Sequence, residues 1–186
     1  MDGMAHTRSA GFSMTELVIT MAIVSILLTI GIPSFKYVTT SNRIATELNG
    51  LLGDMQYARS VAIKEGLPVT VCASSDGQTC DGTSLWENGW IVFLDSNDDQ
   101  AVDNGEVVMR VQPGFATFSS TDTFQPQAGS FTYITFNREG YAATGNAGIV
   151  TLQLHDLTNG TQWTRCLAIT PVGMLSSEKA GVGACT

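Results

Sequence analysis

The stretch GFSMTELVITMAIVSILLTIGIP, residues 11–33, decides the fold of this chain. Between Phe12 and Ile32 its only charged residue is Glu16. A helix of about 20 mainly apolar residues is long enough to cross the hydrocarbon core of a bilayer. The stretch therefore predicts a transmembrane helix close to the N-terminus.

The segment before this stretch is short and consists mainly of polar or small residues, among them His6 and Arg8. Positive charge next to a membrane span is typical of the side that stays in the cytoplasm. The remainder of the chain is therefore expected to be exported.

Two residues are unusual for a simple membrane anchor. An ionised carboxylate such as Glu16 costs about 2.5–3.5 kcal/mol in a spanning helix on insertion scales, so it indicates a function and calls for a cation. Pro33 has no backbone N–H and clashes with the carbonyl group four residues earlier. A helix that continues past Pro33 is expected to kink or loosen near Gly31 and Pro33.

Together these features resemble the type IV pilins and the type II secretion pseudopilins. The matching elements are a hydrophilic leader that ends in Gly11, a first mature residue Phe12, a carboxylate at Glu16, and Pro33. The resemblance implies that a prepilin peptidase cleaves after Gly11 and N-methylates Phe12. It also implies that Glu16 pairs with the N-terminal ammonium group of a neighbouring subunit. The alternative is an uncleaved anchor in which Glu16 has no role.

Length and charge limit the rest of the chain. The 186 residues leave room for one soluble domain of about 120 residues behind a long helix. Nine Lys and Arg residues against seventeen Asp and Glu residues give a net charge of −8. An acidic surface without a basic run disfavours binding to nucleic acid.

Four cysteines follow the apolar stretch, and an even number in an exported domain favours disulfides. Three pairings are possible. The pairs Cys72–Cys80 and Cys166–Cys185 are favoured, because each closes a local loop rich in Gly, Ser or Asp. A zinc site is the alternative, but neither spacing is a two-residue knuckle and His155 is the only histidine of the mature chain.

An amphipathic helix is predicted after Pro33. Apolar residues recur every three or four positions between charged ones, at Ile44, Leu48, Leu51, Leu52, Met55, Ala58 and Ala62. Gly66 and Pro68 form a strong stop signal. The complete helix is expected to run from Phe12 to about Ile63, with its second half packed on the globular domain.

From Leu67 onward the sequence predicts a mainly antiparallel sheet. Short β-rich runs occupy residues 69–73, 90–94, 107–111, 131–136, 149–154 and 162–169. Asn159-Gly160 predicts a tight hairpin turn between the last two runs, and Asp103-Asn104-Gly105 predicts another turn. The expected fold is α+β, with a leader (1–11), a transmembrane helix half (12–33), an amphipathic helix half (34–66) and a β-rich domain (67–186).

The β-rich part resembles the GspH/FimT group of minor pilins and pseudopilins. The runs that carry the resemblance are GWIVFLDSNDD from Gly89, GEVVMR up to Arg110, ITFNREG from Ile134, and RCLAI from Arg165. The resemblance implies a type IV pilin-like fold and a low-copy subunit near the filament tip that helps to start assembly. Members linked to DNA uptake carry a glycine and paired arginines where this chain has GMLS, residues 173–176, so DNA binding is not expected.

An acidic loop is a second candidate for a metal site, in this case for calcium. Oxygen-bearing side chains follow the spacing of an EF-hand loop at Asp95, Asn97, Asp99, Asp103 and Glu106. Gln100 occupies the position where that loop requires glycine, and the flanking segments are predicted strands. The alternative is a solvated hairpin tip, and no metal is expected.

No enzyme or cofactor motif is recognisable in the sequence. We therefore expect a minor pilin of a type IV pilus, with a type II secretion pseudopilin as the alternative and a DNA-binding pilin as an alternative of another class. The expected partners are other minor and major pilins, the prepilin peptidase and the inner-membrane assembly platform. The expected location is the bacterial inner membrane, with the C-terminal domain in the periplasm, and later the pilus.

Overall fold

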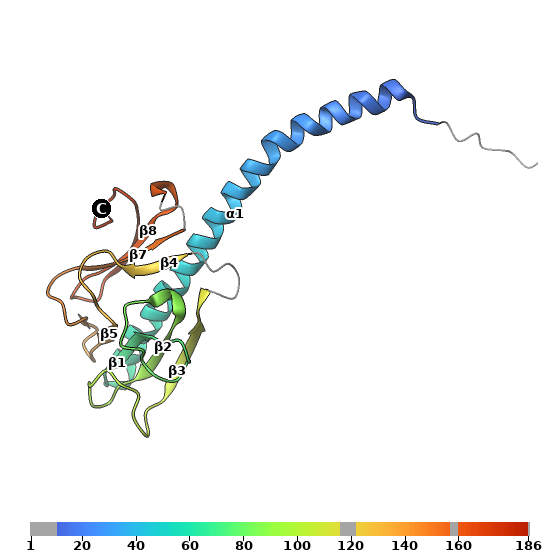
Figure 1. Ribbon diagram of the computed structural model, residues 1–186. Coiled ribbons are helices and arrows are strands. Elements are labelled where there is room, and N and C mark those ends of the chain that lie inside the picture. Colours follow the sequence, from blue (N-terminus) through green and yellow to red (C-terminus); the bar gives the residue numbers. More distant parts are fainter. Residues whose placement is uncertain (1–10, 116–121, 157–159, 186) are drawn as a thin grey trace, which may run out of the picture. The chain divides into compact units, whose positions relative to one another are not determined.

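The computed structural model describes residues 11–115, 122–156 and 160–185. The chain divides into two units, Met1–Thr40 and Ser41–Thr186. One helix, α1 (Met14–Glu65), belongs to both units, and the labelled strands all belong to the second (Figure 1). Each unit is described by itself below.

The first unit consists of the apolar part of α1. Its large apolar side chains are exposed along the whole length. Three hydroxyl groups donate hydrogen bonds to carbonyl groups one turn earlier: Thr20 to Leu17 (2.9 Å), Ser25 to Met21 (2.7 Å) and Thr29 to Ile26 (2.7 Å). These hydroxyls are therefore satisfied within the helix. Pro33 lies inside α1 and does not end it.

The second unit begins with the amphipathic part of α1. Its buried residues lie three or four positions apart on one face, at Ile44, Leu48, Leu51, Met55, Ala58 and Ala62. The helix ends as predicted. Gly66 adopts a φ of 70°, and its N–H donates to the carbonyl of Ala62 (3.0 Å). This left-handed cap is the ordinary role of glycine at a helix C-terminus, and Pro68 prevents continuation.

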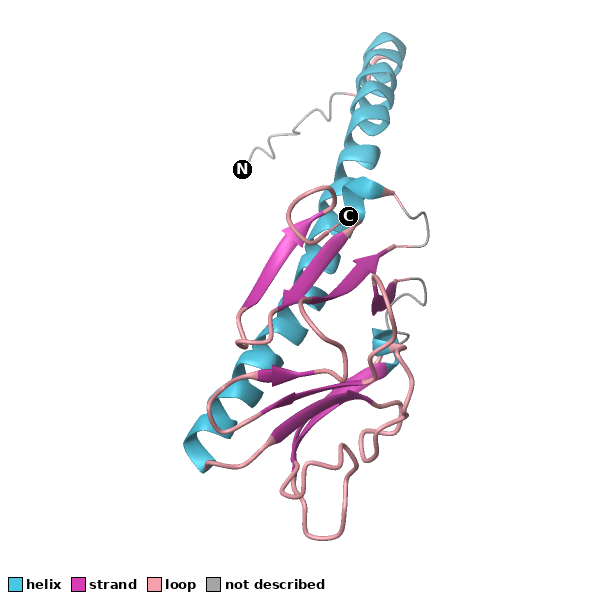
Figure 2. Ribbon diagram, turned by 90° about the vertical axis from the view of Figure 1, so that its left-hand side faces the viewer, coloured by secondary structure: helices cyan, strands magenta, loops and turns pink. Residues whose placement is uncertain are grey.

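Two antiparallel sheets pack on this helix (Figure 2). The first has the order β3-β2-β1-β5-β6, with β1 (Val69–Ala73), β2 (Gly89–Leu94), β3 (Val108–Pro113), β5 (Tyr133–Phe136) and β6 (Ala142–Ala143). The second has the order β4-β7-β8-β9, with β4 (Thr123–Pro126), β7 (Val150–His155), β8 (Arg165–Ile169) and β9 (Leu175–Lys179). The α+β fold expected from the sequence is confirmed.

One hydrophobic core joins the buried face of α1 to the inner faces of both sheets. Trp86 and Trp90 are buried in this core, and Trp86 contacts Phe131 (ring centroids 6.1 Å apart). A smaller cluster of Cys72, Ile91 and Phe93 lies outside this core. Strand β1 is therefore buried at all five positions.

Two disulfides fasten the loops of the second unit. Cys72 is bonded to Cys80, and Cys166 is bonded to Cys185. These are the local pairs favoured by the sequence. The second bond fixes the C-terminal segment to the second residue of β8, and that segment includes the edge strand β9.

The strand pattern differs from the sequence prediction in three places. Strands β4, β6 and β9 were not predicted, because they are short or polar and lack alternating apolar residues. The run predicted at 162–169 is a strand only from Arg165, because Thr161–Trp163 forms a 3-10 turn. The prediction of a tight hairpin turn at Asn159-Gly160 is wrong, because β7 ends at His155 and β8 begins only at Arg165. Asn159 itself lies outside the described residues.

Candidate functional site

The predicted assembly residues lie at the start of α1. Phe12 lies two residues before the first residue of the helix and is 75% exposed. Glu16 lies in the first helical turn, where the partial positive charge of the helix N-terminus favours a carboxylate. Among the described residues, Glu16 has no hydrogen bond and no ion pair. The predicted leader, residues 1–11, lies outside the described residues except for Gly11.

A structural role for Glu16 can be tested against this geometry. Ser13 and Glu16 have the spacing of a capping box, in which the glutamate accepts a hydrogen bond from the N-cap residue. The Ser13 hydroxyl instead shares a hydrogen bond with the Thr15 hydroxyl (2.8 Å). The Glu16 carboxylate is therefore not used in capping, and it is available to a group outside the described residues.

The apolar part of α1 meets the length and composition that a membrane span requires. It is the one such helix in the part of the chain that the structure describes, and none of its apolar window is buried. By contrast, Arg43, Asp54 and Arg59 of the same helix form hydrogen bonds with the rest of the globular unit. The partners of these three residues are far away in the sequence.

Asp54 is the central polar anchor of α1 in the second unit. Its carboxylate accepts hydrogen bonds from the indole N–H of Trp90 (2.9 Å) and from the Arg110 guanidinium (2.7 Å). The Arg110 guanidinium also lies 3.9 Å from the centre of the Tyr57 ring. These contacts connect α1 with neighbouring strands β2 and β3.

Arg59 connects α1 with two turns of the β-rich part. Its guanidinium donates to the carbonyl groups of Gly140 (3.0 Å) and Val172 (3.3 Å). Gly173 adopts a φ of 74° beside the Gly140 carbonyl, where a Cβ atom would clash with the backbone. A hollow of about 420 Å³ lies between this part of α1 and Leu175.

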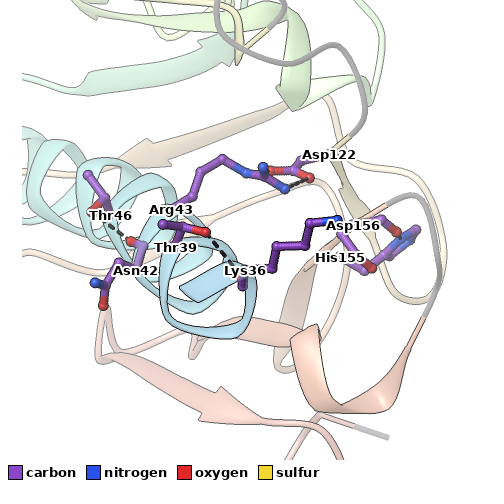
Figure 3. A network of polar contacts seen from close by, with 8 residues as sticks. All are labelled: Lys36, Thr39, Asn42, Arg43, Thr46, Asp122, His155 and Asp156. Atoms are coloured by element: carbon purple, nitrogen blue, oxygen red, sulfur yellow. Dashed lines mark hydrogen bonds and ion pairs between the residues drawn. The ribbon is translucent and has the colours of Figure 1, made fainter. Parts of the chain in front are cut away.

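A third polar cluster lies at the start of the second unit (Figure 3). Arg43 forms two hydrogen bonds with Asp122, the residue before β4: Nε to Oδ2 (2.6 Å) and Nη2 to Oδ1 (2.7 Å). Glu47, one turn after Arg43, also interacts with Asp122. No sequence signal indicates this cluster, because 79 residues separate Arg43 from Asp122.

The acidic loop with EF-hand spacing is folded around backbone N–H groups. Asp95 accepts hydrogen bonds from Thr70 (2.6 Å) and from the backbone of Asp99 and Gln100, and Glu106 accepts from the backbone of Ser96 and Asp103. Burial raises the pKa of Asp95, and the hydrogen bonds that Asp95 accepts from Thr70, Gln100 and Asp99 oppose the rise. The described residues contain no group of three or more acidic, His or Cys side chains arranged to hold a metal ion.

Residues 173–176, GMLS, contain no basic side chain. Gly173 forms a turn, Met174 is exposed, and Leu175 begins β9. His155 ends β7 and hydrogen-bonds to the hydroxyl of Thr123 on the neighbouring strand (2.9 Å). His155 is therefore accounted for by strand packing.

Two solved structures are similar to this chain, both of the type IV minor pilin FimU of Pseudomonas aeruginosa PAO1 in different crystal forms. Each is 21% identical to it, with TM-scores of 0.56 and 0.51. They cover 77% and 74% of this chain, and 92% and 91% of their own chains. At this identity the similarity shows the fold, which is the type IV pilin fold. A comparison with curated proteins gives no match.

Two family models match the sequence itself. The model of the prokaryotic N-terminal methylation motif matches residues 6–32, which include Gly11, Phe12 and Glu16. The model described as type II transport protein GspH matches residues 47–173, more than half of the 186 residues. The chain therefore belongs to the GspH family of type IV pilin-like proteins.

Proposed function

We propose that this protein is a minor pilin that is incorporated into a type IV pilus and helps to start its assembly in the tip complex. The observation that carries the proposal is the unpartnered Glu16 at the start of an exposed apolar helix, within the match to the N-terminal methylation motif. A carboxylate in apolar surroundings requires a cation. In the proposed filament, the N-terminal ammonium group of Phe12 in a neighbouring pilin supplies it.

The proposed partners follow from this chemistry. Other minor and major pilins contact the apolar part of α1, and the prepilin peptidase removes residues 1–11 and methylates Phe12. Before assembly the helix anchors the protein in the inner membrane, with the second unit in the periplasm. Pro33 lies at the end of the apolar stretch, where we propose that it allows the helix to bend or loosen in the filament.

A type II secretion pseudopilin is the second candidate, and the match to the GspH model favours it. A gene deletion in the parent bacterium distinguishes the two. The proposed function predicts loss or strong reduction of surface pili with normal protein secretion, and restoration of pili by the wild-type gene. Normal piliation together with defective secretion would instead support the pseudopilin.

Processing provides an independent prediction. Gly11→Val places a branched side chain at the proposed cleavage site, so the chain should stay uncut in the membrane and absent from filaments. The intact mass of protein extracted from membranes measures this directly. Gly31→Val, a glycine in the same apolar stretch with open space around its Cα, is the matched control and should be cleaved normally. A wild-type mature chain that does not begin at a methylated Phe12 would refute the assignment.

A further inference from the structure

The polar cluster at the start of the second unit contains more negative charge than it can hold without a proton. Asp122 is buried, and the two oxygens of its carboxylate both accept hydrogen bonds from Arg43. The Arg43 side chain is one-third exposed, whereas that of Asp122 is 1% exposed. The guanidinium therefore neutralises one carboxylate and has little capacity for a second.

Glu47 brings a second carboxyl group to this pair. Its carboxyl group lies close enough to Asp122 for the two groups to interact, and its Oε2 atom is buried without a hydrogen-bond partner among the described residues. A hydrogen bond between two carboxyl groups requires a proton on one of them, because two carboxylates in contact repel each other. The buried, unpartnered Oε2 atom and the adjacent Asp122 carboxylate therefore favour a protonated Glu47.

We propose that Arg43, Glu47 and Asp122 form a pH-sensitive latch, which holds the first turns of α1 in the second unit onto the segment before β4 while Glu47 is protonated. The boundary between the two units falls between Thr40 and Ser41, and Arg43 is the third residue of the second unit. Ionisation of Glu47 weakens the packing of residues 41–48, the part of α1 that leads into the apolar helix.

The direction of the pH effect follows from the folded state. Burial of Glu47 and the adjacent Asp122 raise the pKa of Glu47 from 4.5 to about 7, while Arg43 lowers it in part. The closed latch therefore binds a proton more tightly than the open one. The stability that the protonated Glu47 adds to the closed latch is fully present below pH 4.5. It decreases as the pH rises and is lost above about pH 7.

Other ionisable groups lie near the latch and must be separated from it. Figure 3 shows His155 and the following Asp156 in this region. His155, on β7, hydrogen-bonds to Thr123, the neighbour of Asp122. Glu87 accepts a hydrogen bond from the backbone of Phe124 on β4 (3.2 Å). His155 is the important control, because an ordinary histidine also titrates near neutral pH.

Hydrogen exchange of the full mature chain in detergent tests the latch. After correction for intrinsic exchange rates, the opening equilibrium constant of residues 41–50 should increase about fivefold or more between pH 5.5 and 8.0. The shift in pKa sets an upper limit of about 30-fold, and partial exposure of Glu47 reduces it. The helix segment 55–62 should show no comparable change.

Two variants separate the latch from its surroundings. Glu47→Gln keeps the hydrogen-bond donor without an ionisable group, so the pH dependence of segment 41–50 should disappear. His155→Gln should retain it. A wild-type dependence that survives in Glu47→Gln, or is lost in His155→Gln, would overturn the proposal.

A titration of the wild-type chain requires no variant. In a sample with labelled glutamate carboxyl carbons, one resonance, absent from Glu47→Gln, should titrate near pH 7. If every glutamate resonance titrates below pH 5.5, Glu47 is an ordinary surface carboxylate and the latch does not exist.

Discussion

The two parts of α1 have opposite surroundings, although they belong to one helix. In the second unit, Leu51 is completely buried among the strands, whereas Leu27 in the first unit is 64% exposed. The difference does not come from hydrophobicity, because the first part is the more apolar one. It comes from which part of the helix the chain's own β-sheets cover. The sheets cover the second part, and nothing among the described residues buries the apolar window of the first.

The polar residues of α1 differ in the same way. Asp54 and Arg59 in the second unit have hydrogen-bond partners from distant strands and turns. Glu16 in the first unit has no partner among the described residues. The second unit is therefore complete by itself, whereas the first has the apolar surface and the carboxylate of a segment that lipid or other subunits complete.

The largest expected difference concerns truncation of a leucine in each part. Leu51→Ala should lower the free energy of unfolding of the second unit by about 2–5 kcal/mol, because it leaves a cavity in the shared core. Leu27→Ala should change it by less than about 0.5 kcal/mol. Denaturant unfolding of the mature chain in detergent, followed by tryptophan fluorescence, measures both. Equal losses in the two variants would contradict the division into a self-contained and an incomplete part.

The disulfides should affect only the second unit. Replacing Cys166 and Cys185 together by Ser should cost about 3 kcal/mol in the chain-entropy model. Hydrogen exchange should increase after Ile169, including strand β9, while residues 44–62 of α1 remain protected by apolar packing. An equal loss of protection along α1 would show that this disulfide supports the helix as well.

A smaller effect is expected from the polar anchor of the helix. Asp54→Ala leaves the buried indole N–H of Trp90 without its acceptor and should cost about 1–3 kcal/mol. Glu139→Ala removes an exposed carboxylate that pairs only with the neighbouring Arg138, so it should cost less than about 0.5 kcal/mol. The same unfolding experiment compares the two. Equal stability of both variants would mean that Asp54 does not anchor the helix.

Local patterns predicted much of this fold. The apolar run, the three- and four-residue spacing from Ile44 to Ala62 and the stop at Gly66 predicted α1, because these signals depend only on neighbouring residues. The central strands were predicted for the same reason. Strand β9 was not, since its sequence LSSEK is polar and its pairing depends on β8.

The candidate site was predicted unevenly. Glu16 and Pro33 are conspicuous in an apolar sequence, so composition alone indicates them. The partners of Arg43, Asp54 and Arg59 could not be predicted, because hydrogen bonds across the fold leave no periodic signal in a single sequence.

The central claim is that Glu16 is completed by another subunit, and incorporation of Glu16→Ala into filaments tests it most directly. Loss of one partner of a buried ion pair costs about 3–5 kcal/mol, so entry into sheared filaments should fall at least tenfold, with normal cleavage and membrane levels. Glu139→Ala, the control, should enter normally. Immunoblots of the membrane and filament fractions measure both variants, and undiminished incorporation of Glu16→Ala would contradict the account.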